Sequence, residues 1–237
     1  MSRNFAGHDA GHDAGSAQQH DAGLYATIFR RRDVRASFTG APVPDEVMRR
    51  VLSAAHGAPS VGLSQPWDFI LVESERTRAS FWKHVQQERE AFAETLPPDR
   101  AELFARIKIE GIRESSLGVV VTYDSSRGDP GVLGRHAIAD AGLYSVCLAV
   151  QNLWLAATAE NLGVGWVSFY REAFLQELLG IPSGVRPVAW LCIGAVSHLE
   201  RVPDLERHGW RSRLALEEVV HCERWGEQAI ALTQGAT

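Results

Sequence analysis

The first periodic run of apolar positions begins after Pro44 and predicts an amphipathic helix that ends at Gly57. Its apolar face consists of Val47, Val51, Leu52 and Ala55. A polar loop follows, and the unbroken apolar run at residues 69–72 then indicates a buried strand.

The middle of the chain alternates between helical and extended patterns. Helices are expected over residues 76–94 and 99–112, and a Pro-Pro pair separates the two helical runs. A strand is expected at residues 117–122. The longest periodic segment covers residues 136–161, with Gly163 as its C-terminal stop. Apolar residues nearly encircle it, so we predict a central, buried helix.

The last core elements are predicted to be a strand at residues 166–169, a short helix at 172–179 and a strand at 188–196. Strands and helices are thus interspersed, and helices dominate by length. No GxGxxG or GKS/T motif follows a predicted strand, so the sequence offers neither a dinucleotide fingerprint nor a P-loop.

The composition predicts one sizeable core, because 45% of the 237 residues are hydrophobic and 22% are charged. The net charge of −5 gives no general attraction to nucleic acid, so clustered arginines indicate local anion recognition. Three widely spaced cysteines fit reduced thiols in the cytoplasm. No apolar stretch approaches the ~18 residues of a membrane span, and no signal peptide is expected.

Residues 1–23 contain a Gly-His-Asp-Ala repeat and no apolar run. His8, His12 and His20 could in principle hold a metal, but a tract that cannot bury a core predicts a disordered tail without a metal site. We therefore expect such a tail over residues 1–23 and one folded domain over residues 24–237.

The segment Arg31-Arg32-Asp33-Val34-Arg35 sets a carboxylate among three guanidinium groups. Guanidinium forks match phosphate oxygens, so the cluster predicts a bound anion. The alternative is a solvated basic turn beside one salt bridge. A second pair, Arg211 and Arg213, lies on a predicted extended arm, where alternate residues point the same way and can converge on one ligand.

Three segments together resemble the nitroreductase-like flavoprotein family: the RxxxR cluster at 31–35, a PSxxxxQPW loop at 59–67 and an RSRL arm at 211–214. The resemblance implies an α+β fold with a mixed central sheet surrounded by helices. It also implies a homodimer with two flavins at the subunit interface. The arginine groups would clasp the phosphate of flavin mononucleotide (FMN), and the loop would follow its ribityl chain and ring.

A narrower resemblance indicates the branch of this family that makes 5,6-dimethylbenzimidazole, the lower ligand of cobalamin (vitamin B12). It rests on residues 107–112, 132–135, 144–157 and 163–168, although Ser116 departs from an expected proline. Members of this branch fragment reduced FMN with oxygen and also release erythrose 4-phosphate. The resemblance therefore implies that FMN is a consumed substrate and oxygen a co-substrate.

Asp33 and Ser168 are the catalytic residues that the resemblance implies. Asp33 replaces a small polar residue of ordinary nitroreductases, and Ser168 replaces a proline. A carboxylate can take or relay a proton, and a hydroxyl can donate to a flavin nitrogen. In the alternative reading, flanking arginines lower the pKa of Asp33 within a structural salt bridge, and Ser168 bonds to backbone at a strand end.

The FMN-binding residues are expected in the two arginine groups, the loop, the 107–111 stretch near the end of the 99–112 helix, and the 166–169 strand. They are Arg31, Arg32, Asp33, Val34, Arg35, Ser60, Gly62, Leu63, Ile107, Ser168, Arg211 and Arg213, and part of the remaining 108–111 stretch is also expected to line the flavin. Leu63 stands where the loop commonly carries asparagine. Residues 81–104 exceed what a strand connection needs, so a helical lid over the flavin is expected there. Trp67, Trp154 and Trp190 are expected in the core.

Two other functions remain open at this point. One is an NAD(P)H-dependent nitro- or quinone reductase that recycles bound FMN. The other is a non-catalytic flavin-binding or corrinoid-interacting protein. The sequence has no recognisable nicotinamide site, so we expect a separate flavin reductase to supply reduced FMN.

Overall fold

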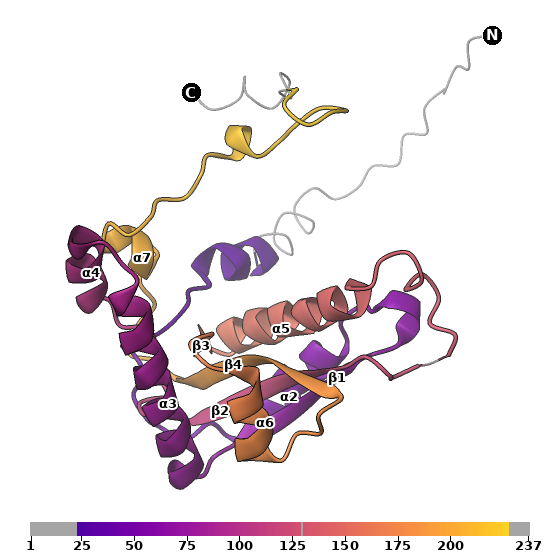
Figure 1. Cartoon of the computed structure of the whole chain (residues 1–237), viewed down its shortest axis with the longest axis horizontal. Helices are drawn as coiled ribbons and strands as arrows, with labels where there is room; N and C mark the ends of the chain where they lie inside the picture. The colour runs from indigo at the N-terminus through magenta and orange to yellow at the C-terminus, as the bar shows by residue number, and fades with distance from the viewer. Residues whose placement is uncertain (1–22, 129, 228–237) are drawn as a thin grey trace.

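The computed structural model describes residues 23–128 and 130–227, which place a four-stranded sheet between two helical layers (Figure 1). The strands are β1 (Trp67–Val72), β2 (Leu117–Asp124), β3 (Leu162–Val167) and β4 (Val185–Ala195), in the spatial order β1-β2-β4-β3. All three neighbouring pairs are antiparallel. The resemblance implied a mixed sheet, but the four strands form an antiparallel one. Within the described residues, the one parallel contact is the isolated bridge between Asp33 and Val164.

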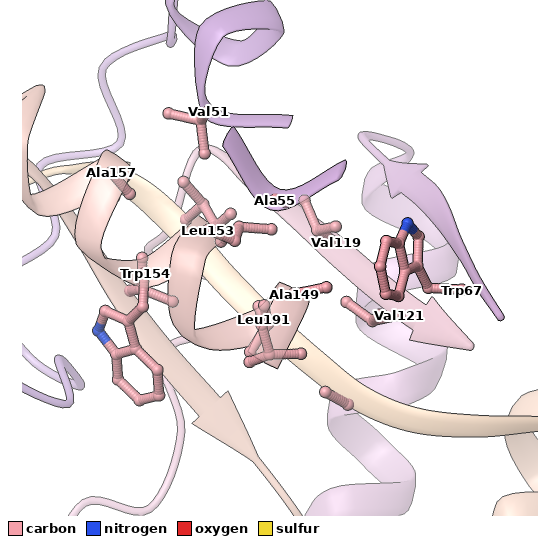
Figure 2. Packing of buried hydrophobic residues seen from close by; sticks show 14 of the residues in the cluster. Val51, Ala55, Trp67, Val119, Val121, Ala149, Leu153, Trp154, Ala157 and Leu191 are labelled. Atoms are coloured by element: carbon pink, nitrogen blue, oxygen red, sulfur yellow. The ribbon is translucent and has the colours of Figure 1, made fainter. Parts of the chain in front are cut away.

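One face of the sheet is covered by α2 (Asp45–His56) and α5 (Ala141–Ala159). Figure 2 shows Val51 and Ala55 of α2 and Leu153 of α5 gathered over the sheet. Trp67 and Trp154 are buried in the same cluster, which confirms that they belong to the core. The predicted apolar face of α2 is also confirmed, since each of its four residues packs in this cluster.

The opposite face is covered by α3 (Glu75–Glu94) and α6 (Glu172–Leu179). Phe81 of α3 is fully buried and stacks on the core residue Trp190 of β4, with 3.8 Å between ring centroids. Helices on both faces explain why β2 is almost continuously apolar.

Beyond the end of α3 lies α4 (Pro98–Ala105), which contacts the segment after α7 (Asp204–Arg207). The Arg100 guanidinium lies 3.8 Å from the centre of the Trp210 ring. From there the chain continues through η2 (Leu216–Glu218) as an arm that leads away from the sheet (Figure 1).

The N-terminal part of the described chain is a helix over residues 23–30. It lies beside the end of α5, because Arg30 Nη2 donates to the Thr158 carbonyl at 2.6 Å. The tail expected over residues 1–23 lies outside the described residues except for Gly23, and so do His8, His12 and His20.

Two predicted helix boundaries are wrong. The 99–112 helix ends at Ala105, because Ile107 and Ile109 are buried at the two-residue spacing of an extended chain. The 136–161 helix begins only at Ala141, and Asn161 in the left-handed conformation (φ 60°) follows its end. Gly163 belongs to β3 instead, where a Cβ would lie 2.4 Å from the Val196 side chain.

α5 also corrects the expectation that no segment is long and apolar enough to span a membrane. By length and composition alone this helix qualifies, but 50% of its most apolar window is buried within the protein. Its contacts with α2 and the sheet are those of a core helix.

Candidate active site

The arginine cluster runs alongside β3 and is fastened to it by hydrogen bonds. Val34 N donates to the Val164 carbonyl at 2.9 Å, and Trp166 N donates to Asp33 Oδ1 at 3.0 Å. Such a close approach needs a glycine at position 165, since a Cβ there would lie 2.2 Å from the Val34 carbonyl oxygen. The Asp33 carboxylate is thereby fixed at the edge of the sheet.

Asp33 and Ser168 line one pocket of about 310 Å³, although they are far apart in the sequence. Ser168 directly follows β3, and its exposed hydroxyl makes no hydrogen bond within the described chain. The walls are largely apolar and aromatic, as expected for a water-poor site. The other lining residues are Arg35, Ile107, Lys108, Ile109, Trp166, Phe169, Pro203, Asp204 and Leu205.

The pKa of Asp33 is shifted in the direction opposite to the one expected from its flanking arginines. The Asp33 side chain lines the pocket, and 46% of its surface is accessible. Burial raises the pKa of Asp33, outweighing the lowering by Arg35, the Trp166 N–H and Arg31. Asp204 adds to the rise as a like charge. The predicted lowering of this pKa was wrong, because a sequence shows the flanking charges but not the desolvation.

Arg35 is the arginine that pairs with Asp33, at 2.5 Å, and it also donates to the Trp166 carbonyl at 2.6 Å. Arg32 is turned toward backbone, donating to the carbonyls of Phe29, Arg31 and Arg201. Arg32 Nε and Arg35 Nη1 are nevertheless buried without a protein partner among the described residues. Both side chains are therefore held in place with donor capacity to spare.

Arg31 lies over the Trp154 ring, 4.8 Å from its centre, and its guanidinium makes no hydrogen bond to residues 23–128 or 130–227. Burial lowers the pKa of Arg31; Asp33 opposes this, while Arg213 and Arg32 lower it further. Arg213 is thus one of the cations that act on Arg31, and both Arg211 and Arg213 are exposed on the C-terminal arm. An anion placed between these cations would relieve their mutual repulsion.

The loop residues Ser60, Gly62 and Leu63 lie elsewhere. Their loop contains η1 (Val61–Leu63) and is fastened to the start of α5, where Val61 N donates to Ser145 Oγ at 3.0 Å. The arginine cluster lies at the other end of α5, whose 19 residues span about 28 Å (Figure 1). One chain therefore does not bring the loop and the cluster together.

The loop nevertheless has the strained backbone that is typical of ligand-binding segments. Leu63 and Gln65 have positive φ angles of 53° and 44°, and the Leu63 side chain is 79% exposed. Val34, by contrast, has a buried side chain and can offer a ligand only its backbone.

Sequence reasoning missed Asp204, a charged residue of the pocket, whereas Lys108 lies in the 107–111 stretch that was expected to contribute to the flavin site. Lys108 pairs with Glu114 at 2.6 Å, and Asp204 pairs with Arg207 at 2.5 Å. Asp204 lies in no sequence pattern that marks a site, because only the folded position of the start of α7 brings it to the pocket.

Comparison with known proteins places this geometry in a family. A model described as the nitroreductase family matches residues 28–195, most of the chain. The chain belongs to the nitroreductase family. It is also 39% identical over 191 residues to a 5,6-dimethylbenzimidazole synthase of Rhodospirillum rubrum, covering 81% of this chain and 90% of that relative.

Two solved structures show that the fold is that of this family. An iodotyrosine deiodinase bound to FMN and 3-iodo-L-tyrosine has a TM-score of 0.65 at 23% identity, over 81% of this chain and 97% of the other. A BluB-like flavoprotein of Clostridium difficile 630 has a TM-score of 0.64 at 20% identity, over 85% and 99%. The expected nitroreductase-like α+β fold is confirmed.

Proposed function

We propose that this chain is a 5,6-dimethylbenzimidazole synthase that consumes reduced FMN and oxygen. The observation that carries the proposal is the convergence of Asp33 and Ser168 on one apolar-walled pocket beside an arginine cluster. The identity to a named synthase over most of both chains supports the same activity. By the same proposal erythrose 4-phosphate is the second product, and the enzyme works in the cytoplasm.

The residues around the pocket fit FMN. The buried and partnerless Arg32 Nε and Arg35 Nη1 add to the cations Arg31 and Arg213, a donor set that suits a phosphate. We assign the phosphate and polar tail of FMN to Arg31, Arg32, Arg35, Arg211 and Arg213, and the backbone bonds of Arg32 and the Asp33 pair of Arg35 also hold the cluster in place. When bound, reduced FMN supplies the ring to be fragmented and the electrons that oxygen takes up.

We assign the proton transfers of this reaction to Asp33. Trp166 N and Arg35 fix the orientation of its carboxylate, and the raised pKa brings it closer to the range in which a carboxyl group both accepts and releases a proton. The Ser168 hydroxyl has no competing partner in the described chain, so it is free to hydrogen-bond to the flavin or to an oxygen-derived group.

A second copy of the chain would complete the site. The exposed side of α5 carries Tyr144, Cys147 and Leu148, an unusually apolar surface for a helix that faces solvent. Two copies joined through antiparallel α5 helices would bring the loop at Ser60–Leu63 of one chain to the arginine cluster of the other. The proposed homodimer therefore explains why one chain separates these two groups.

The proposed lid lies in α4 and the segment after it, not in α3. Phe81 and Val85 anchor α3 in the core, whereas α4 buries only Phe104. Ile107 and Ile109, which follow α4, line the pocket. Movement of this part would open the pocket without breaking the helical layer, and its closure would keep water from the reaction.

The alternative of a recycling FMN reductase predicts a different outcome in one experiment. Reduced FMN is bound to the protein without oxygen, air is admitted, and the products are identified by mass spectrometry. A synthase loses one FMN for each dimethylbenzimidazole formed, while a reductase or a binding protein returns FMN intact. A separate flavin reductase, included as the source of reduced FMN, should allow repeated turnover.

A further inference from the structure

The connection that carries Ser168 is held by one face of α3. Residues 168–171 join β3 to α6, and α3 contacts Phe169, Tyr170 and Arg171. The ring of Phe92 lies 5.6 Å from that of Phe169, and the ring of Phe81 lies 5.9 Å from that of Tyr170. Ser168, the first residue of the connection, has no hydrogen bond of its own in the described chain, so its position depends on these contacts.

The polar contact in this series is made by His84. Its Nε2 accepts a hydrogen bond from Arg171 N at 3.0 Å, and its ring stacks on Phe174 of α6, with centroids 3.9 Å apart and planes 6° from parallel. One turn later on α3, Glu88 pairs with the Arg171 guanidinium at 2.9 Å. The helix thus holds both the backbone and the side chain of Arg171.

The contact at Arg171 N requires a neutral imidazole. A backbone N–H can only donate, so Nε2 must be unprotonated and Nδ1 must carry the hydrogen. Burial lowers the pKa of His84; Glu88 opposes this and Arg171 adds to it. Glu88 is the charged group that acts on the imidazole from α3, and Arg171 is the one that acts from the connection. From α6, the apolar ring of Phe174 packs against it. The imidazole is therefore neutral near pH 7.

We propose that neutral His84 is a positioning residue, which fixes residues 168–171 through Arg171 N and thereby directs the Ser168 hydroxyl into the pocket. This inference rests on the proposed function and deepens it. Protonation would set an imidazolium N–H against the Arg171 N–H, beside the Arg171 guanidinium. The connection would then be released and Ser168 would lose its orientation.

The same contact links pH to stability. The pKa of His84 is lower in the folded chain than in the unfolded chain, so the unfolded chain binds more protons at mildly acidic pH. The contribution of His84 is then complete above a pH of about 6.5 and is lost as the pH falls below that value.

Two substitutions separate the acceptor from the stacking ring. His84→Phe keeps a ring against Phe174 but cannot accept from Arg171 N. His84→Gln offers an oxygen near the position of Nε2 and does not titrate. His56→Phe is the matched control, because His56 also accepts a hydrogen bond, from Trp67 Nε1 at 3.1 Å, on the opposite side of the sheet.

We expect His84→Phe to lower the rate of dimethylbenzimidazole formation by about 10- to 100-fold, the scale of a small misplacement of a reacting group, with unchanged affinity for reduced FMN. His84→Gln should restore most of the rate that His84→Phe loses. In the pH profile of His84→Gln, the fall of the rate at acidic pH should lack the part that protonation of His84 causes. His56→Phe should keep the parent rate. A His84→Phe enzyme with the parent rate and pH profile would overturn the proposal.

A second measurement does not depend on turnover or on the stability of a variant. The hydrogen-exchange protection of the Arg171 amide, corrected for the intrinsic pH dependence, should fall in the wild-type protein as His84 becomes protonated. Protection that stays constant through the His84 titration would overturn the proposal. If the wild-type protein forms no dimethylbenzimidazole, the proposed function fails, and the exchange result alone decides whether His84 holds the connection.

Discussion

At the scale of single residues, Asp33 combines a structural and a chemical task. Its carboxylate accepts from Trp166 N and pairs with Arg35, which fastens the arginine cluster to β3, and it also faces the pocket. A residue that only fastened the cluster would not need the raised pKa that burial gives it.

The first prediction concerns Asp33→Asn. Asparagine can still accept from Trp166 N, so reduced FMN should bind, but without a base the yield of dimethylbenzimidazole should fall by ~100-fold or more. Oxygen should still be consumed, and FMN should be recovered oxidised. Flavin titration and product analysis test this. An asparagine variant that works at the parent rate would leave Asp33 a salt-bridge partner, with Ser168 the remaining candidate.

The second prediction is a pH dependence. A base must be ionised, so the rate should fall as the pH drops through the pKa of Asp33, which lies above the ordinary 3.8. His84→Gln is the suitable background for the rate measurement, because it removes the other group proposed to titrate. An acid limb at the ordinary carboxyl value would show that burial does not govern this group.

Asp33 and Ser168 could be chosen from the sequence because each departs from a family pattern in a chemically meaningful direction. The direction in which the pKa of Asp33 is shifted could not be predicted from the sequence, since it depends on how far the folded chain removes the carboxylate from water. The place of Asp204 in the pocket could not be predicted from the sequence either, because it depends on how the start of α7 folds against the pocket. His84 is a single histidine on an amphipathic helix, and only the structure shows its contact with Arg171 N.

At the scale of elements, strand β3 organises the site. Its glycine positions allow the cluster to lie against it, and its end delivers Ser168. The sequence predicted most elements, since α2 and α6 follow helical periodicity and β1, β2 and β4 are apolar runs. The sequence did not predict the end of the 99–112 helix correctly, because a tertiary contact sets it. Ile107 and Ile109 are buried in an extended segment that ends the helix.

The third prediction tests the contact between β3 and the cluster. Gly165→Ala would place a Cβ 2.2 Å from the Val34 carbonyl oxygen, so it should destabilise the fold by about 1–3 kcal/mol or more and weaken FMN binding. Gly184→Ala is the matched control, because a Cβ there meets nothing within 4 Å. Thermal unfolding and flavin titration compare the two. Equal effects would contradict the account of this contact.

The fourth prediction concerns the C-terminal arm. Replacing Arg211 and Arg213 with alanine should weaken binding of reduced FMN by about 1.5–3 kcal/mol for each charge-assisted bond that is lost. Arg76→Ala, which removes an exposed arginine at the start of α3, should leave the affinity unchanged. If the double variant binds as the parent does, the phosphate is held elsewhere.

At the scale of the whole molecule, the separation of the loop from the cluster across α5 is the feature that one chain cannot explain. The fifth prediction follows from it. Leu148→Glu places a charge on the exposed apolar side of α5, so it should give a monomer with little flavin affinity. Gln87→Glu, on an exposed position of α3, is the control. Sedimentation with flavin fluorescence measures both, and a Leu148→Glu monomer with full affinity would contradict the composite site.

The central claim is that the protein destroys FMN to make dimethylbenzimidazole. The most direct test is to bind a known amount of reduced FMN anaerobically, admit air, and quantify FMN and products by mass spectrometry. We predict one dimethylbenzimidazole for each FMN lost, with oxygen required. Complete recovery of FMN, with no dimethylbenzimidazole after exposure to air, would contradict the claim.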